Sequence, residues 1–194
     1  MSNIVKFKFT LKGTVVPDNY GGKSGRFVET LLKSLGIPLD NSKGMDCKLY
    51  GFELKTRYTN ATSAQTVATA TIDEWKTTPY DYSVVKEKFQ KQYRVHIDPI
   101  IKDGVQVGGV IVNDEFYDFS PNHIQSLIKE AYDICREQII AGLKIDYIYG
   151  SYWGYAERKP ESSSYSFRLS PAAYTKLEAM AKSTYSTLFE DETV

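Results

Sequence analysis

The segment Met45-Asp46-Cys47-Lys48-Leu49-Tyr50-Gly51-Phe52-Glu53-Leu54-Lys55 carries the strongest structural signal in this sequence. Successive side chains of a β-strand point to opposite faces, so Glu53 and Lys55 share one face and Phe52 and Leu54 share the other. The apolar face is expected to pack into a core. The charged face is therefore expected to line a groove.

A turn precedes this charged strand. The sequence predicts two short strands, near 46–50 and 51–57, with Gly51 at the turn between them. A hairpin-like return of this kind would bring the carboxylates of Asp46 and Glu53 close together.

These residue types suit phosphodiester hydrolysis. The carboxylates of Asp46 and Glu53, with the carbonyl of Leu54, offer the oxygen ligands that Mg²⁺ prefers. Such a metal polarises a phosphate and lowers the pKa of a bound water. Lys55 could position or deprotonate that water, or stabilise the charge that develops on the phosphate.

The bare Glu-x-Lys triplet is not specific, because it also occurs at Glu74/Lys76 and Glu157/Lys159. The run from Asp73 to Pro79 has the composition of a turn and is expected to form a solvated loop. The segment 157–160 is a polar run that ends in proline. A surface ion pair is the alternative interpretation for Glu53 and Lys55 as well.

The rest of the chain alternates irregularly between the two kinds of secondary structure. Apolar spacing and start and stop signals predict helices and strands. The helices are expected near 24–35, 84–90, 120–142 and 171–183, and the further strands near 4–10, 64–72, 93–97, 105–112 and 165–169. A turn at Asp103-Gly104 is expected to join the strands at 93–97 and 105–112. This order predicts a mixed α/β or α+β domain with a central sheet flanked by helices.

The composition fits one globular domain. The 194 residues are 42% hydrophobic and contain no apolar run long enough to cross a membrane, so we expect no membrane association. Two cysteines favour a reducing cytoplasm. Lys and Arg balance Asp and Glu at 24 each. This balance does not exclude a nuclease, because metal-binding carboxylates offset phosphate-binding cations.

Two motifs together resemble a known family. The run Gly22-Lys23-Ser24-Gly25-Arg26-Phe27-Val28-Glu29 and the later Asp46 with Gly51-Phe52-Glu53-Leu54-Lys55-Thr56 are similar to motifs of MutH. MutH is a mismatch-repair nicking endonuclease related to the type II restriction enzymes MvaI and BcnI. The resemblance is strong over 22–56 and looser from there to the end of the chain. It implies a restriction-endonuclease-like fold, with a catalytic core at about 20–115 and a helical, DNA-recognition part at about 120–183.

The resemblance also implies roles for individual residues. Asp46 and Glu53 would be metal ligands, Lys55 the catalytic lysine, and Glu29 a helix glutamate that supports the site. A solvated helix residue is the alternative for Glu29. Lys88 is the best match for a further active-site lysine, with Lys86 as its competitor and a charged helix face as the alternative for both.

DNA contacts are expected from several cationic and aromatic residues. The start of the first predicted helix could receive a phosphate, with Lys23 and Arg26 adding positive charge. Tyr165 and Arg168 resemble an aromatic and a basic residue of the family's DNA-contacting segment. Arg158 and Lys159 lie nearby in sequence, with a solvated loop as the alternative. The aromatic residues of the segment 147–155 could stack on bases, although core packing is the more common role of such residues.

The sequence therefore predicts an Mg²⁺-dependent endonuclease, with Mn²⁺ as a substitute, that cuts double-stranded DNA at a specific site and leaves 5′-phosphates. The resemblance suggests a restriction or nicking enzyme with a GATC-type site and accessory repair or modification proteins. One chain carries one such cluster, so cutting both strands would need a DNA-dependent dimer or successive nicks by a monomer. The alternatives are a DNA-binding module without activity and a structure-selective nuclease.

Overall fold

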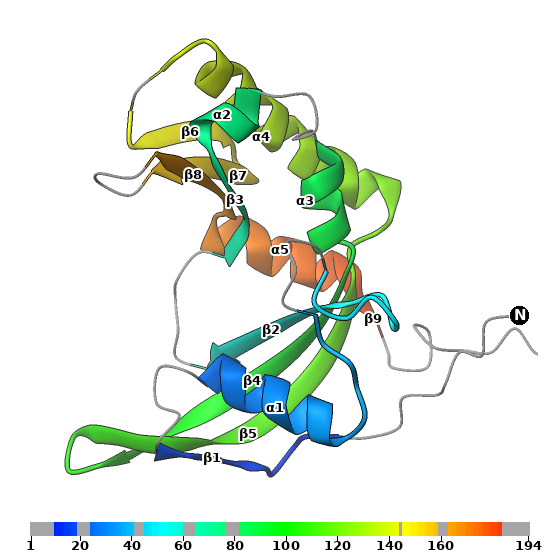
Figure 1. Cartoon of the computed structure of the whole chain (residues 1–194), viewed down its shortest axis with the longest axis vertical. Coiled ribbons are helices and arrows are strands. Elements are labelled where there is room, and N and C mark those ends of the chain that lie inside the picture. The colour runs from blue at the N-terminus through cyan, green and yellow to red at the C-terminus, as the bar shows by residue number, and fades with distance from the viewer. Residues whose placement is uncertain are drawn as a thin grey trace, which may run out of the picture. The chain divides into compact units, whose positions relative to one another are not determined.

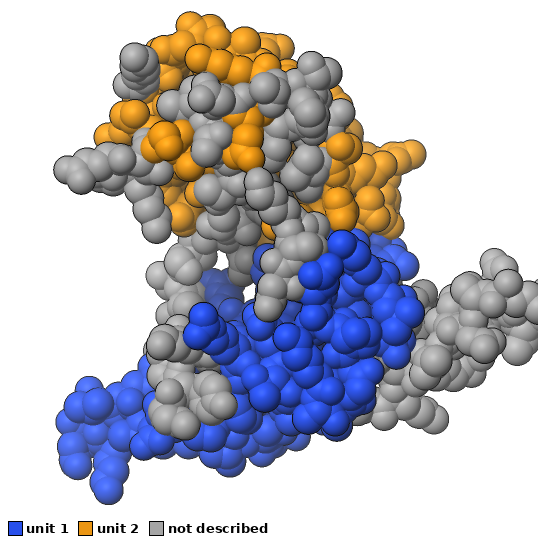
Figure 2. Space-filling model, viewed as in Figure 1, with its two compact units in different colours: residues 1–61, 91–118, 182–194 blue, residues 62–90, 119–181 orange. Residues whose placement is uncertain are grey.

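The computed structural model describes residues 10–18, 24–40, 45–59, 65–76, 82–143, 145–158 and 163–183. The chain divides into two compact units (Figure 2). Unit 1 consists of residues 1–61, 91–118 and 182–194, and unit 2 of residues 62–90 and 119–181. The predicted core at about 20–115 includes residues 62–90, which belong to unit 2, so its division from the part at about 120–183 stays a prediction. That the whole chain acts as one endonuclease domain stays a prediction.

Unit 1 is built on a mixed sheet with the strand order β1-β5-β4-β2, and β9 pairs with β5. Strand β2 runs parallel to β4, and the other pairings are antiparallel (Figure 1). The elements of this unit are β1 (Val15–Pro17), α1 (Ser24–Ser34), β2 (Glu53–Tyr58), β4 (Lys91–Lys102), β5 (Val105–Asp118) and β9 (Lys182–Ser183).

Strands β4 and β5 form the long hairpin of the unit. Asp103 and Gly104 make the turn with φ angles of 52° and 77°. A hairpin turn with two positive φ angles matches the twist of the flanking strands, and Asp-Gly is a favoured pair for it. The turn predicted at Asp103-Gly104 is confirmed, and both strands are longer than expected.

Helix α1 packs its apolar stripe against one face of this sheet. Val28 and Leu32 of the helix are fully buried in one cluster with Leu54, Val95 and Ile97 of the strands. The helix expected at 24–35 is thus confirmed with nearly the same bounds. It covers the apolar face of β2, so the charged face of β2 is the opposite one.

Unit 2 contains an antiparallel sheet with the strand order β3-β8-β7-β6. The long helix α4 contacts β6 and β7. At Gly150 the chain comes so close to α4 that an added Cβ would lie 2.3 Å from the carbonyl oxygen of Ala131, so only glycine fits there. The elements are β3 (Gln65–Thr71), α2 (Ile72–Lys76), α3 (Tyr82–Lys88), α4 (Asn122–Ile140), β6 (Tyr147–Ser151), β7 (Gly154–Arg158), β8 (Ser164–Leu169) and α5 (Pro171–Ala181).

The chain therefore has an α+β fold with two separate sheets and several helices. The expectation of one central sheet is corrected, because the strands of unit 2 pair with one another in a sheet of their own. None of the helices in the described parts of the chain has the length and apolarity that a membrane crossing requires. The strand expected near 4–10 lies almost wholly outside the described residues.

Two local predictions are wrong. Residues 46–50 form no strand, since only an isolated bridge joins Cys47 to Phe52 around a tight turn. A solvated loop was expected from Asp73 onward, but residues 73–76 lie in helix α2. The reason is Trp75, which is fully buried and stacks on Tyr132 with ring centroids 5.1 Å apart.

Candidate active site

A tight turn returns the chain to the start of β2. The backbone N–H of Cys47 donates to the carbonyl of Phe52 at 2.9 Å, and Phe52 donates back at 3.1 Å. Gly51 takes a φ of +69° in this turn, a conformation that glycine adopts without steric cost. The predicted hairpin-like return is thus present, although it is made by a turn and not by two strands.

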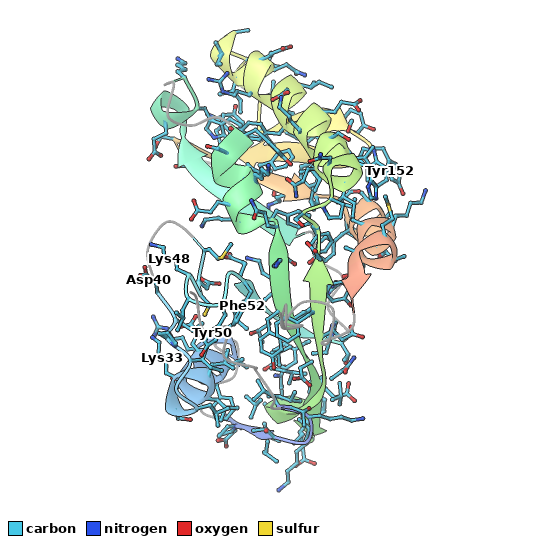
Figure 3. All side chains as sticks on the ribbon, turned by 90° about the vertical axis from the view of Figure 1, so that its right-hand side faces the viewer. Lys33, Asp40, Lys48, Tyr50, Phe52 and Tyr152 are labelled. Carbon is cyan, nitrogen blue, oxygen red and sulfur yellow. The ribbon has the colours of Figure 1, made fainter. Side chains whose placement is uncertain are left out.

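The preceding segment is anchored at two points. The side chains of Lys48 and Asp40 form an ion pair at 3.1 Å (Figure 3). The backbone N–H of Asp40 also donates to the carbonyl of Asp46 at 2.6 Å. Because the chain that follows α1 is tied to this turn, the position of Asp46 relative to β2 is fixed within unit 1.

Asp46, Glu53 and Lys55 come together as predicted. The ammonium of Lys55 lies 2.7 Å from Oε1 of Glu53, and the backbone N–H of Asp46 donates to Oε2 of Glu53 at 3.2 Å. Oδ2 of Asp46 accepts a hydrogen bond from the backbone N–H of Leu54 at 2.9 Å. The side chain of Glu53 is 6% exposed and that of Lys55 22% exposed, so Lys55 remains open to solvent or a ligand.

The cluster has two carboxylates but only one ammonium to balance their charge. The pKa of Asp46 is raised from its ordinary 3.8 to about 6, first by burial and then by repulsion from Glu53. The hydrogen bond from Leu54 and the charge of Lys55 act in the opposite direction. Two carboxylates held together beside one ammonium favour the binding of a further cation.

The carbonyl of Leu54 is oriented toward the same place. Strand β2 lies at the end of the strand order, and one of its edges has no neighbouring strand among the described residues. Within a strand, the N–H and C=O of one residue point to the same edge. Because the N–H of Leu54 points to Asp46, its carbonyl lies on that same free edge.

These groups fit a hard divalent cation with mostly oxygen ligands. Asp46, Glu53 and the Leu54 carbonyl would supply three of the ligands, and water or a phosphate oxygen the others. Within the described parts of the chain, no three His, Cys, Asp or Glu side chains form a metal-binding group.

Glu29 belongs to the electrostatic environment of the cluster. It lies on α1, half-buried, and its charge contributes to the raised pKa of Asp46. Among the causes of that shift, the charge of Glu29 is the smallest. A direct metal contact by Glu29 stays a prediction.

Sequence reasoning missed a polar row that continues from the site across the sheet. In the parallel register, Glu53 lies opposite Gln92 and Lys55 lies opposite Arg94. Both β4 residues are almost fully buried, at 1% and 0% exposure. The alternation of polar 92, 94 and 96 with apolar 93, 95 and 97 was the available signal for a strand with one polar face.

The groups of this row contact one another. Nη2 of Arg94 donates to Oε1 of Gln92 at 3.2 Å, and the guanidinium lies 4.2 Å from the ring centre of Tyr117 on β5. The hydroxyl of Tyr117 donates to Glu115 at 2.5 Å. A buried, hydrogen-bonded layer of this kind holds the strand that neighbours Glu53 and Lys55 in place.

The two candidate lysines of α3 lie in unit 2. Lys88 is half-buried and Lys86 is exposed. Lys86 lines an open pocket of about 450 Å³ together with Tyr82, Ser83, Lys129, Asp133 and Arg136. The role of Lys88 stays a prediction, and the pocket contains none of the residues of the candidate active site.

The predicted DNA contacts have different outcomes. Arg26 is exposed on α1, and Lys23 and Lys159 lie outside the described residues. The guanidinium of Arg158 pairs with Asp146 at 2.9 Å, and that of Arg168 pairs with Glu157 at 2.9 Å. Both arginines are partly exposed, and their contacts with DNA stay predictions.

The role assigned to Tyr165 requires correction. Its side chain is 1% exposed, and its hydroxyl donates to the carbonyl of Ile145 at 2.8 Å. The alternation of β8 directs Tyr165 to the buried face of the sheet together with Phe167 and Leu169. Since neither its ring nor its hydroxyl is available, Tyr165 is a core residue.

Comparison with known protein families finds no family that matches this chain, and a search of curated proteins finds no match either. The candidate site therefore depends on its own geometry.

Proposed function

We propose that the chain is a DNA endonuclease that depends on a divalent metal and hydrolyses phosphodiester bonds at the Asp46–Glu53–Lys55 cluster. The observation that carries the proposal is the joining of two carboxylates and one ammonium at the start of β2, on the edge where the Leu54 carbonyl lies. The substrate would be double-stranded DNA and the products would carry 5′-phosphates.

The fold of unit 1 supports this proposal at a coarser level. A mixed sheet with a parallel β2–β4 pair and a helix packed on the apolar face is compatible with the restriction-endonuclease-like core that the resemblance implies. Membership of that fold, the relation to MutH and the recognition of a GATC-type site are parts of the proposal.

Each group of the cluster has a definite task in this scheme. A bound Mg²⁺ would polarise the scissile phosphate and lower the pKa of an attacking water. Asp46 and Glu53 would bind the metal, and the hydrogen bond from Leu54 would orient the Asp46 carboxylate. The Lys55 ammonium, held by Glu53, would donate hydrogen bonds to the water and to the charge that develops on the phosphate.

The proposal is tested with supercoiled plasmid DNA incubated with the full-length protein and Mg²⁺. We expect nicked or linear products, and sequencing of the ends should show 5′-phosphates and a recurrent sequence. Glu53→Gln should abolish cleavage, because it removes a metal-binding charge without a large change in shape.

Asp103→Asn is a matched control. Asp103 is exposed in the β4–β5 turn of the same unit, and asparagine also adopts its positive φ. This variant should cut DNA at the wild-type rate. Cleavage by Glu53→Gln at the wild-type rate would show that the site is misplaced. A lack of any cleavage by the wild-type protein across diverse DNA would reject the nuclease function.

A further inference from the structure

The two faces of the unit 2 sheet differ sharply in composition. In the cross-strand register, Tyr149 lies opposite Tyr155, and Tyr155 lies opposite Arg168. These side chains share one face because side chains alternate along each strand. The residues between them, such as Ile148 and Ala156, are fully buried on the other face.

The first face carries exposed aromatic rings. Tyr147 is 51% exposed and Tyr149 is 61% exposed, and Tyr155 lies half-buried between them. The rings of Tyr147 and Tyr155 stack with centroids 4.6 Å apart and an interplanar angle of 26°. We call Tyr147, Tyr149 and Tyr155 the tyrosine face. It lies on β6 and β7 (Figure 1).

This exposure is not a general property of tyrosines in the chain. Tyr93, Tyr132 and Tyr174 are each buried to 1% exposure or less in the cores of the units. Four of the 15 tyrosines occur between residues 147 and 155, which the composition alone would not lead us to expect. Exposed aromatic rings offer π faces on which a planar ligand can stack.

The surroundings of the tyrosine face are polar and partly cationic. The other side chains that the register places on this face of β7 and β8 include Glu157, Ser166 and Arg168, which are polar or charged. Burial raises the pKa of the Tyr155 hydroxyl, the charge of Arg168 lowers it, and the charge of Glu157 raises it.

A second cation lies at the end of the hairpin. The ammonium of Lys176 on α5 lies 4.8 Å from the ring centre of Tyr152, which is itself 43% exposed (Figure 3). Planar rings, polar groups and nearby cations together match the bases and phosphates of a single strand. Proteins that bind single strands combine aromatic stacking with positive charge in this way.

We propose that the tyrosine face binds the unpaired bases of single-stranded nucleic acid, which stack on Tyr147, Tyr149 and Tyr155, while Arg168 and Lys176 attract the phosphates. The site belongs to unit 2 and shares no residue with the Asp46–Glu53–Lys55 cluster. The inference therefore stands independently of the nuclease proposal.

The test measures binding of the full-length protein to a fluorescein-labelled oligothymidylate of about 12 nucleotides by anisotropy, in EDTA so that no metal-dependent cleavage intervenes. An abasic oligonucleotide of the same length keeps the phosphates but lacks the bases. We expect the oligothymidylate to bind at least about tenfold more tightly, because base stacking supplies much of the affinity.

Two variants of one residue separate stacking from other contacts. Tyr149→Leu removes the aromatic face and should weaken binding about fivefold to a hundredfold, the range expected for the loss of one base stack. Tyr149→Phe keeps the ring and should bind within about twofold of the wild type, because the π surface carries the interaction. Since Tyr149 is exposed, neither change should alter thermal stability appreciably.

Two results would overturn the inference: equal affinity for the abasic and the thymidylate strands, or undiminished binding by Tyr149→Leu. The first would show that phosphates alone are bound. Single-strand binding without any DNA cleavage in Mg²⁺ would reject the nuclease proposal and leave this inference intact.

Discussion

The substitution Asp46→Asn should stabilise the metal-free protein at alkaline pH. Asparagine offers its side-chain oxygen to the Leu54 N–H in place of Oδ2, so the hydrogen bond of 2.9 Å can persist. What is lost is a charge that lies half-buried beside Glu53. The variant therefore isolates the electrostatic cost of the cluster from its packing.

The magnitude follows from the pKa of Asp46. Its rise from 3.8 to about 6 means that the folded state holds this proton more tightly than the unfolded state does. Free energy of unfolding is therefore lost as the pH rises between these two values, and the full penalty remains above them. The shift would correspond to at most about 3 kcal/mol. Screening by solvent around a half-exposed carboxylate reduces this to about 1–2 kcal/mol.

The assay is urea unfolding in EDTA at pH 4 and pH 8. At pH 8 the free energy of unfolding of Asp46→Asn should exceed that of the wild type by about 1–2 kcal/mol, because the repulsion is gone. At pH 4 the two proteins should differ little. Addition of Mg²⁺ at pH 8 should stabilise the wild type much more than the variant, since a ligand that binds only the folded state raises its stability.

Asp103→Asn again serves as the control, because it removes one exposed carboxylate from unit 1 and should show neither effect. The reasoning would be refuted if Asp46→Asn were less stable than the wild type at pH 8 in EDTA. A gain of equal size at pH 4 and pH 8 would also refute it, since the cause would then not be the ionisation of Asp46.

The remaining predictions concern the metal, two lysines and the polar row. Cleavage should require Mg²⁺ or Mn²⁺ and stop in EDTA, whereas Ca²⁺ should support DNA binding without turnover; undiminished cleavage in EDTA would reject the metal site. Lys55→Met should lower the rate of single-turnover cleavage by about two to four orders of magnitude. Lys76 is an exposed lysine on α2, and Lys76→Met should cleave within about tenfold of the wild-type rate. The reverse pattern would exclude β2 as the active-site strand. Arg94→Met should lower the free energy of unfolding in urea by about 1–3 kcal/mol, because buried Gln92 loses the hydrogen bond from Arg94. An unchanged free energy of unfolding would show that the polar row does not stabilise the fold.

The sequence predicted the local features that depend on near neighbours. The period-two pattern around Glu53 identified the two faces of β2, and the apolar spacing over 24–35 identified α1. The Asp-Gly pair at 103 and 104 identified the turn of the long hairpin. Each of these signals acts within a few residues, so a single sequence carries it.

Features that depend on distant partners were not predictable in the same way. Nothing near residue 75 shows that Trp75 will stack on Tyr132, yet that contact makes the start of an apparent loop helical. Tyr165 was assigned to the DNA contacts because its segment resembles the family's DNA-contacting segment. Its alternation with Phe167 and Leu169 was the better signal, and it correctly describes a buried face.

The same argument explains why the site itself was only partly foreseen. Asp46, Glu53 and Lys55 lie within ten residues of one another, and a single turn joins them. Gln92 and Arg94 reach the site only because β2 pairs in parallel with β4, and that pairing joins segments nearly 40 residues apart. Residues 92–95 of β4 are buried on both faces of the strand, although one of these faces is polar. Buried polar groups need hydrogen-bond partners, and side chains on the neighbouring strands can provide them. A polar alternation within a strand is therefore a reason to search the neighbouring strands for the groups that satisfy it. Here the register of β4 and β2 leads from Gln92, which accepts from Arg94, to Glu53.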